Sequence, residues 1–573
     1  MSETSKKQTF LQGTVLLAAA TAMVKVIGAL YKIPLKGIID DTGFSYFDTA
    51  YQIYAVLLLI STAGLPVAMS RMISHANSLG QYQQVRKIYS VSRTIFLLLG
   101  LFSALLMGCF SGLLAQVYHQ PGAQLSIIAL APAAFLICLM STYRGFFQGQ
   151  GNMLPTSVSQ VLEAIAKLVV GIALAALVIY AIQGDIPWAA AGAIFGVTIS
   201  CLVSALYLSY CYRKAIRNMP VTQEVTSSKK EIAKSLLSIA IPITIGSAGL
   251  QLLNLLEIGI YMDNLAINAD GMYTLQQLQE KLTLYGYNGE TPLAELTKAE
   301  CIEYFISTHK GIYNFACTFF NLPGSFITPI TISIIPAITA QLALNKSKDA
   351  KVTGESAVRI CALIAMPCSF GLILIADPLM RVLGYSGEKL ELAVQLMMIM
   401  GSCVVFNAFV LLTNAIMQAY GREKLPVINM FVGGFVKLGA VYLLTKNPDI
   451  GIMGAPIGSL LCYLCIMVLN LFTMRKVLKQ PPAILKNMLR AFLSAVLMGI
   501  CVVGALHGLE FLMGDLLSGI IASVKIRALL SCAIPVCVGV VVYAIAVIKL
   551  RAITREDCLL LPKGEKIANL LHL

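Results

Sequence analysis

Charge is the scarcest feature of this chain. Of its 573 residues only 12% are charged and 58% are hydrophobic, whereas a soluble domain carries roughly 25% charged residues. The alternation of apolar and polar residues that marks the strands of a membrane barrel is also missing. Instead, solid apolar runs of about 20 residues recur from end to end, which is typical of a polytopic helical membrane protein. The sequence therefore predicts an all-α membrane protein.

Signatures of enzymes are absent as well. The chain has neither a phosphate-binding Gly-x-x-x-x-Gly-Lys-Ser/Thr loop nor a His-Glu-x-x-His metal motif, and its five histidines are dispersed. A membrane-embedded transferase would need carboxylates or histidines clustered at one membrane interface, and the sequence shows no such cluster. We therefore expect no enzymatic activity, no catalytic residues, no metal and no cofactor.

The cysteines and the net charge have ordinary explanations in a membrane protein. Fifteen cysteines are scattered through apolar segments, and Cys462 and Cys465 form a Cys-x-x-Cys with no second pair, so we interpret them as small buried hydrophobic residues. The net charge of +14 fits basic loops on the cytoplasmic side of a membrane, not nucleic-acid binding. The first apolar run, 10–35, is too long for a cleavable signal peptide, and another span follows it.

About fourteen segments are long and apolar enough to cross a bilayer. Their predicted cores are residues 10–34, 46–72, 88–114, 124–147, 155–182, 187–212, 236–262, 309–340, 355–382, 390–418, 426–445, 451–474, 487–508 and 527–549. The polar and basic segment 214–235 divides the spans into six and eight. The predicted parts are therefore a first lobe, a cytoplasmic linker, a second lobe, two additional spans and a cytoplasmic tail: 1–213, 214–235, 236–474, 475–550 and 551–573.

Loop charges predict the orientation. Basic pairs recur in the loops of one side, as at Arg86 and Lys87 or Arg422 and Lys424, whereas the opposite loop 263–308 is acidic. The positive-inside rule then puts both termini in the cytoplasm, and the even number of spans agrees.

Two stretches of the chain resemble each other. Nineteen positions separate Gln148 from Lys167, and the same number separates Gln418 from Lys437. A glycine-containing turn and a Leu-Pro pair lie between the two residues in each copy. Because six spans separate the copies and six is even, we expect two lobes of the same orientation with a binding site between them.

Ionisable side chains inside spans are costly and usually face a cavity or a partner. Lys25 lies near the middle of the first span, which favours a water-filled cavity. Lys32 lies about two turns further along the same face and either shares that cavity or reaches the headgroups. Glu163 and Lys167 are four residues apart, so they form either a local ion pair or a cavity wall with a titratable carboxylate.

The other charged candidates lie nearer the span ends. Arg71 and Arg144 are either anchors at the cytoplasmic surface or cavity residues, and Asp48 and Asp263 are near the predicted outer surface, where they are either solvated or coupled to an ion. The candidate cavity cations are Lys25, Lys32, Arg71, Arg144, Lys167 and Lys437. The candidate polar or ion-coupling residues are Asp48, Gln148, Glu163, Glu257, Asp263 and Gln418. The deep charges are mainly cationic, which suits an anionic substrate such as a phosphate or pyrophosphate on a lipid carrier.

Segments 51–81, 143–168 and 553–571 resemble the polysaccharide-transport branch of the multidrug/oligosaccharidyl-lipid/polysaccharide exporter superfamily, in particular the proteins similar to stage V sporulation protein B. The stretch from Arg144 to Pro155 is the most specific part of the resemblance. The resemblance implies fourteen helices in two lobes, with a lipid-linked oligosaccharide carried from the inner to the outer leaflet by alternating access. Lipid II flippases have cations bracketing a glycine in the first helix, and Lys25, Gly28 and Lys32 match this pattern in type. The arginine that they carry shortly before the Leu-Pro of span eight is absent, with Thr318 near that position.

These observations lead to a main hypothesis and two alternatives. The main hypothesis is a flippase in a bacterial cytoplasmic membrane that moves an anionic lipid-linked glycan for peptidoglycan, envelope or spore-cortex assembly. Membrane potential or a cation gradient would drive it, and cell-wall synthesis enzymes are expected as further partners. The alternatives are a cation-coupled multidrug exporter of the same superfamily and a non-transporting membrane scaffold.

Overall fold

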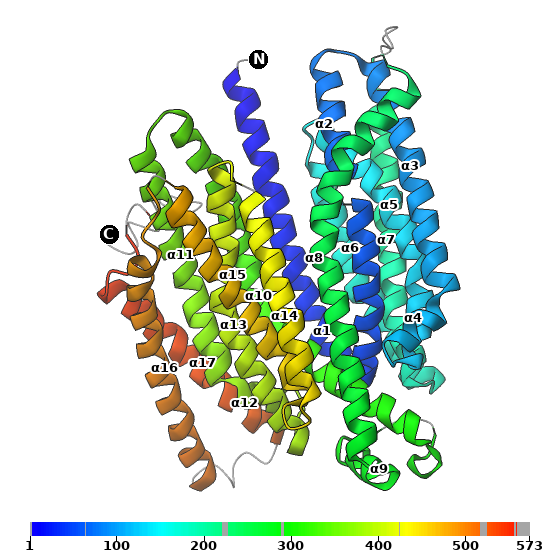
Figure 1. The fold of residues 1–573 in the computed structure, drawn as a ribbon, viewed down its shortest axis with the longest axis vertical. Helices are drawn as coiled ribbons and strands as arrows, with labels where there is room; N and C mark the ends of the chain where they lie inside the picture. Colours follow the sequence, from blue (N-terminus) through cyan, green and yellow to red (C-terminus); the bar gives the residue numbers. More distant parts are fainter. Residues whose placement is uncertain are drawn as a thin grey trace. The chain divides into compact units, whose positions relative to one another are not determined.

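The computed structural model describes residues 3–62, 65–220, 227–287, 291–422, 424–478, 480–515, 524–554 and 557. Every regular element in these ranges is a helix, which confirms the all-α class (Figure 1). The chain divides into two compact units, Met1–Gly311 and Ile312–Leu573. The predicted boundary between the lobes, at residues 214–235, follows the sequence repeat. The boundary between the two compact units lies later, at Gly311, because the residues before it make most of their contacts with one another.

Among the described residues of the first unit, eight α-helices come before a short ninth one and the long helix that leads into the second unit. They are α1 (Glu3–Thr62), α2 (Leu65–Ser78), α3 (Tyr82–Cys109), α4 (Ser111–Val117), α5 (Gln124–Gly149), α6 (Leu154–Ala176), α7 (Ile186–Arg217) and α8 (Lys229–Met272). Short turns η1 (Pro121–Ala123) and η2 (Leu177–Ile182) join some of them. Helix α9 (Leu275–Leu284) and turn η3 (Leu293–Glu295) follow, and then α10 (Lys298–Ala343) begins.

The second unit starts within α10, and its described residues end at Asp557. Its helices are α11 (Ser347–Leu374), α12 (Ala376–Val382), α13 (Gly387–Ala419), α14 (Lys424–Lys446), α15 (Gly454–Val477), α16 (Ile484–Asp515) and α17 (Val524–Lys549), with η4 (Gly451–Met453) before α15. Buried apolar residues of α11 and α13, including Cys361 and Phe409, form its core. Asp557 in the tail is fully buried and accepts hydrogen bonds of 2.7–3.0 Å from Arg359 of α11.

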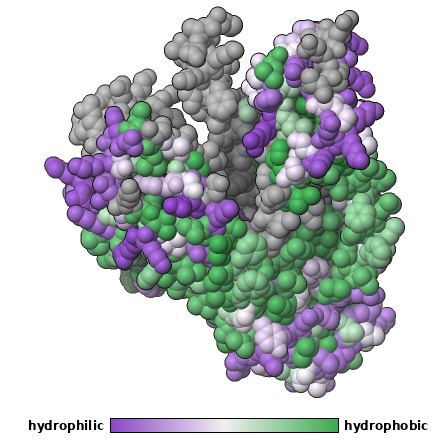
Figure 2. All heavy atoms as spheres, turned by 45° about the horizontal axis from the view of Figure 1, so that its top comes forward, coloured by the Kyte–Doolittle hydropathy of each residue, from purple (hydrophilic) through white to green (hydrophobic). Residues whose placement is uncertain are grey.

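Ten helical segments in the described residues have the length and hydropathy of a membrane span. The predicted spans 10–34, 46–72, 236–262 and 309–340 fall in the long helices α1, α8 and α10 and at the start of α2. Hydrophobic side chains cover the middle of the face drawn in Figure 2, and hydrophilic ones gather toward its ends, as expected of a surface in contact with lipid. The chain is thus a multi-pass membrane protein, and the count of fourteen spans stays a prediction.

Helix α1 consists of two helices joined at a sharp break. The backbone of Asp40 has φ 57° and ψ −175°. Residues other than glycine adopt a backbone conformation with such a positive φ only at a cost of about 1–3 kcal/mol. The break separates the first predicted span from the beginning of the second. Two potential spans therefore follow each other in α1 with a single residue between them.

In both sequence copies a glycine lies at a close contact between two neighbouring helices. A Cβ atom added to Gly196 of α7 would lie 2.4 Å from Gly171 of α6. In the second copy, a Cβ on Gly458 of α15 would lie 2.4 Å from Val441 of α14. Gly171 precedes Val441 by the same 270 positions that separate Lys167 from Lys437. Small residues at these contacts let the backbones approach closely, as in other membrane helices.

Helix α10 also approaches the backbone of α1 without room for a side chain. A Cβ on Gly311 would lie 1.9 Å from the carbonyl oxygen of Asp41 and 2.6 Å from its carbonyl carbon. Both atoms belong to the backbone, so rotation of a side chain cannot relieve the clash.

We predict that Gly311→Ala lowers the stability of the protein by roughly 1–3 kcal/mol or more, because the clash forces a backbone shift. Gly324→Ala on the same helix is the control, since a Cβ there meets no atom within 4 Å and alanine favours a helix by up to about 1 kcal/mol. The measurement is thermal unfolding in detergent. Equal midpoints for the two variants would contradict the close approach.

Candidate functional site

A half-buried lysine of α6 lies against aromatic rings of α1. The Lys167 ammonium is 4.6 Å from the ring centroid of Tyr51, 5.4 Å from that of Tyr31 and 5.9 Å from that of Phe47. The Tyr31 hydroxyl donates to the carbonyl of Ala193 on α7 at 3.2 Å, which fixes one of these rings. Cation–π contacts of this kind stabilise an ammonium away from water without neutralising it.

A second lysine approaches the same region from the first half of α1. The Lys32 ammonium lies 5.5 Å from the ring centroid of Phe44, and both Lys32 and Glu163 act electrostatically on the Tyr51 hydroxyl. We call Lys32, Tyr51, Glu163 and Lys167 the Tyr51 cluster. The sequence analysis had selected three of these four residues, and the structure brings them together within the first unit.

The carboxylate of this cluster has a partner on another helix. Arg144 of α5 donates to Glu163 at 2.9 Å, and its Nε donates to the Ser159 hydroxyl at 3.1 Å. The Arg144 and Glu163 side chains are 15% and 26% exposed. Glu163 thus forms its ion pair across helices α5 and α6 instead of with Lys167 one turn away, although its charge still acts on Lys167. In the structure Arg144 is thus the ion-pair partner of Glu163, and its role in a cavity stays a prediction.

The remaining predicted cations lie in other places. Arg71 is exposed on α2 and Gln148 is half-buried on α5. Lys25 lies in α1, but its side chain is outside the described residues. Lys437 is half-buried in α14 and Gln418 is exposed in the last turn of α13. Both belong to the second unit, so their convergence with Lys167 stays a prediction.

The predicted acidic residues separate into buried and exposed ones. Asp48 of α1 and Glu257 of α8 are each 5% exposed, which excludes the solvated alternative for Asp48 and leaves its coupling to an ion as a prediction. Asp48 is covered because the second half of α1 packs against α10. Asp263 is exposed as expected, and its carboxylate contacts the His119 imidazole at 2.7 Å.

The second copy carries an uncharged network at the positions of the Arg144–Glu163 pair. The offset of 270 residues places Asn414, Asn429 and Gly433 where the first copy has Arg144, Ser159 and Glu163. The fully buried Asn470 links these amides: it accepts from Asn429 at 2.9 Å and donates to Asn414 at 2.8 Å. In this layer of the helices the ionic pair is therefore a property of the first copy alone.

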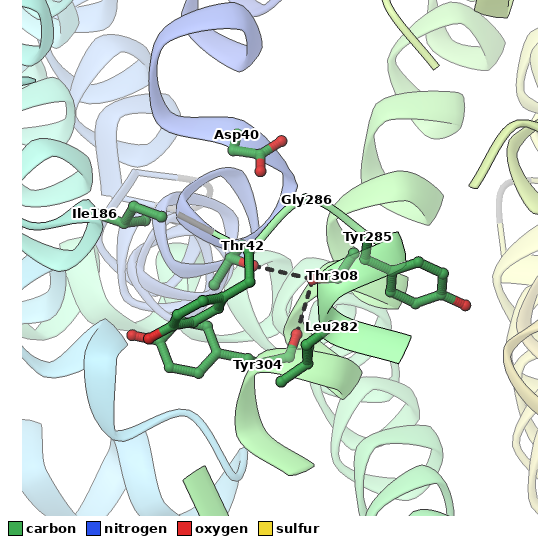
Figure 3. Close-up of a pocket in the computed structure, with 9 residues that line it drawn as sticks. Asp40, Thr42, Ile186, Leu282, Tyr285, Gly286, Tyr304 and Thr308 are labelled. Carbon is green, nitrogen blue, oxygen red and sulfur yellow. Dashed lines mark hydrogen bonds between the residues drawn. The ribbon is translucent and has the colours of Figure 1, made fainter. Parts of the chain in front are cut away.

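A small hollow of about 10 Å³, with room for roughly one water molecule, lies where α1 breaks (Figure 3). It is lined by Asp40, Thr42, Ile186, Leu282, Tyr285, Gly286, Tyr287, Tyr304 and Thr308. The hydroxyls of Thr42 and Thr308 are 3.0 Å apart and join α1 to α10.

At the start of α10, hydrogen bonds from Thr297 hold the pKa of the Glu300 carboxyl below its usual range.

The sequence analysis missed two buried lysines. Lys310 of α10 is fully buried, and Lys36 of α1 is 8% exposed and lies 3.7 Å from the Asp41 carboxylate. Lys310 stands at the second position of a predicted span, and Lys36 just beyond the end of another. Lysines at such positions usually reach the headgroups. The sequence signal for Lys310 is the run of mainly apolar residues that follows it directly.

Comparisons with known proteins agree with this architecture. Residues 10–341 match the family model described as "Polysaccharide biosynthesis protein", and residues 308–443 match that described as "MatE". The first match covers more than half of the chain. The chain belongs to the polysaccharide biosynthesis protein family. In broader terms it is a membrane transporter of the multidrug/oligosaccharidyl-lipid/polysaccharide exporter superfamily.

Curated relatives and solved structures cover most of the chain. Stage V sporulation protein B of Bacillus subtilis (strain 168) is 28% identical over 82% of this chain and 85% of its own length. Lipid II flippase MurJ of the same organism is 24% identical over 75% of this chain and 76% of its own. A solved structure of lipid II flippase MurJ has a TM-score of 0.60 with 14% identity, covering 94% of this chain and 99% of its own.

A multidrug transporter structure of the MATE family shares the fold as well. It has a TM-score of 0.55 and 16% identity and covers 79% of this chain and 98% of its own.

We predict that Arg144→Ala lowers stability more than Glu163→Gln does. The first change leaves a largely buried carboxylate without its partner, which costs roughly 1–3 kcal/mol or more, whereas the second keeps a hydrogen-bond acceptor. Thermal unfolding in detergent measures the difference. Arg381→Ala is the control, because its pair with Asp377 is about half exposed and such pairs contribute roughly 0–1 kcal/mol. A larger loss for Arg381→Ala than for Arg144→Ala would contradict this assignment.

Proposed function

We propose that the protein moves an anionic lipid-linked glycan across the membrane, with the Tyr51 cluster binding its phosphate or pyrophosphate. The Lys167 ammonium supports this proposal most directly. Its neighbours are neutral aromatic rings, and the nearby Glu163 is already bonded to Arg144. The positive charge of the Lys167 ammonium is therefore not neutralised by a partner among the residues that the structure describes, and it is available to bind an anionic substrate.

The aromatic rings suit the rest of such a headgroup. Tyr51 and Phe47 present neighbouring rings whose centroids are 6.2 Å apart and nearly parallel. Flat apolar faces and hydroxyl groups complement the two kinds of surface that a sugar ring presents. A polyprenyl tail would stay in the lipid while the headgroup crosses through the protein.

The proposed direction of transport follows from the proposed orientation. With both termini in the cytoplasm, an inside-negative potential favours outward movement of an anion by about 2.3 kcal/mol per charge per 100 mV. A cation gradient would reset the empty protein. The peptidoglycan precursor lipid II and related polyprenyl-pyrophosphate glycans are the proposed substrates, and the enzymes that make or use them are the proposed partners.

The match of residues 308–443 to the MatE model favours a second candidate, a cation-coupled multidrug exporter. Cationic drugs require a free carboxylate in the binding site. Since Glu163 is paired with Arg144 and two lysines accompany it, the Tyr51 cluster favours an anionic substrate over a cationic drug.

We predict that Lys167→Ala and Lys32→Ala each reduce transport at least about tenfold, because a hydrogen bond to a charged group contributes roughly 1.5–3 kcal/mol and 1.4 kcal/mol corresponds to a factor of ten. The measurement uses reconstituted vesicles and a fluorescent polyprenyl-pyrophosphate glycan whose exposure on each leaflet is quantified. An inside-negative potential should accelerate outward movement.

The control variant is Lys446→Ala, an exposed lysine in the last turn of α14, which should transport as the unaltered protein does. Undiminished transport by both Lys32→Ala and Lys167→Ala would refute the assigned site. Export of a cationic dye without movement of the glycan would establish the multidrug alternative.

A further inference from the structure

Lys310 is fully buried where the first part of α10 packs against α1 and η1. Its ammonium donates to the Thr49 hydroxyl and, at 3.3 Å, to the Gln120 side-chain carbonyl. The Asp48 carboxylate acts on it electrostatically. An ammonium removed from water is retained only where other groups replace its hydration, and here those groups come from two separate segments of the chain, α1 and the residue before η1.

A second layer of hydrogen bonds holds these oxygens in place. The Gln120 amide donates to the Ser45 hydroxyl at 2.5 Å and to the Ser307 hydroxyl at 2.9 Å. We call these four residues, Ser45, Thr49, Gln120 and Ser307, together with the neighbouring carboxylate of Asp48 that acts on Lys310 electrostatically, the Lys310 cage. Each of the five is at most 5% exposed. Their orientation thus depends on the fold and not on solvent.

The Lys310 cage contains an oxygen atom that does not bond to Lys310 and could bind a cation. Among the described residues, the buried Oδ2 atom of Asp48 has no hydrogen-bond partner. Hydroxyl, amide and carboxylate oxygens are the ligands that hard cations take in proteins. A single carboxylate balances one positive charge, so the composition suits a monovalent cation and would leave a divalent one uncompensated in a buried place.

We propose that the Lys310 cage is a monovalent-cation site whose built-in occupant is the Lys310 ammonium. The tethered cation joins α10 to α1 beside two further links, the Thr42–Thr308 contact and the hydrogen bond of 3.0 Å from the Tyr46 hydroxyl to Glu303. Removal of the lysine side chain then leaves a site that small cations from solution enter. This inference does not depend on the transported substrate, because the site and the test involve no glycan.

The test is chemical rescue of Lys310→Ala. The protein contains fifteen cysteines, and buried ones such as Cys301 allow a thiol-reactive dye to report thermal unfolding in detergent. We expect Lys310→Ala to lower the unfolding midpoint by several degrees. Methylammonium chloride should raise this midpoint with a saturating dependence on concentration, as for a ligand that binds the folded state. Choline chloride at equal ionic strength should have no such effect, because the quaternary ammonium is too large.

Three controls distinguish a cation site from a merely structural lysine. Methylammonium should not shift the midpoint of the unaltered protein, nor that of Lys298→Ala, which removes an exposed lysine of the same helix paired with Asp270. It should also fail to rescue the double variant Asp48→Asn/Lys310→Ala. A loss of stability in Lys310→Ala that neither methylammonium nor sodium chloride restores would overturn the proposal.

A second measurement applies if Lys310→Ala does not fold. Lys310→Met keeps most of the volume of the side chain, and Asp48→Asn removes the carboxylate charge. Each should lower the unfolding midpoint, and the double variant should lose less than the sum of the two, because the charges compensate each other. Additive losses would show that Asp48 does not belong to the site.

Discussion

The cost of removing a charge from water governs the interior of this protein. The deep cations of the first unit meet that cost in different ways. Lys167 lies on aromatic rings, Arg144 is paired with Glu163, and Lys310 is bonded to side-chain oxygens. These solutions have different electrostatic consequences. The ion pair is nearly neutral as a whole, whereas the aromatic rings leave the charge of Lys167 available, and the oxygens of the Lys310 cage fix the ammonium where two helices meet.

The two sequence copies have diverged at the layer where charge matters. Asn414, Asn429 and Asn470 satisfy one another with neutral hydrogen bonds in the second unit, and such amides hold membrane helices together without a net charge. The first unit carries an ionic pair in the corresponding layer, with Lys167 one turn away. Gly196 and Gly458 each lie at a close contact between neighbouring helices. Both copies therefore have closely packed helices, whereas the ion pair of Arg144 and Glu163 lies in the first copy.

Much of the fold could be predicted from the sequence because lipid imposes simple rules. Solid apolar runs gave the helices, and lysines within those runs gave Lys32 and Lys167. An interruption between residues 34 and 46 was predicted, but its form was not: α1 continues through it with one residue of positive φ, Asp40, and residues 36–45 contain no proline to mark that position. The pairing of Glu163 with Arg144 was missed for a different reason. Sequence spacing identifies neighbours on one helix, such as Lys167, but not partners on an adjacent helix.

The burial of Lys310 at the end of a predicted span also depends on contacts with other segments, which the sequence does not show. A lysine near the beginning of an apolar run is normally assigned to the headgroup region, since its chain is long enough to reach it. Here the Asp40 break directs the following residues of α1 against α10, so Ser45 and Thr49 lie where water would otherwise be. The environment of Lys310 is therefore decided by a backbone conformation more than two hundred residues earlier.

The way in which Lys167 is held also fits the requirements of transport. A lysine bonded to a carboxylate must lose that partner before it can bind an anion, and breaking a buried ion pair costs about 3–5 kcal/mol. A lysine on aromatic faces keeps its existing contacts while an anion approaches its free side, and each such contact contributes only about 0.5–2 kcal/mol. Binding and release then require little rearrangement of the site. Because a carrier must release its substrate as well as bind it, an aromatic environment suits a transported anion better than an ion-paired one.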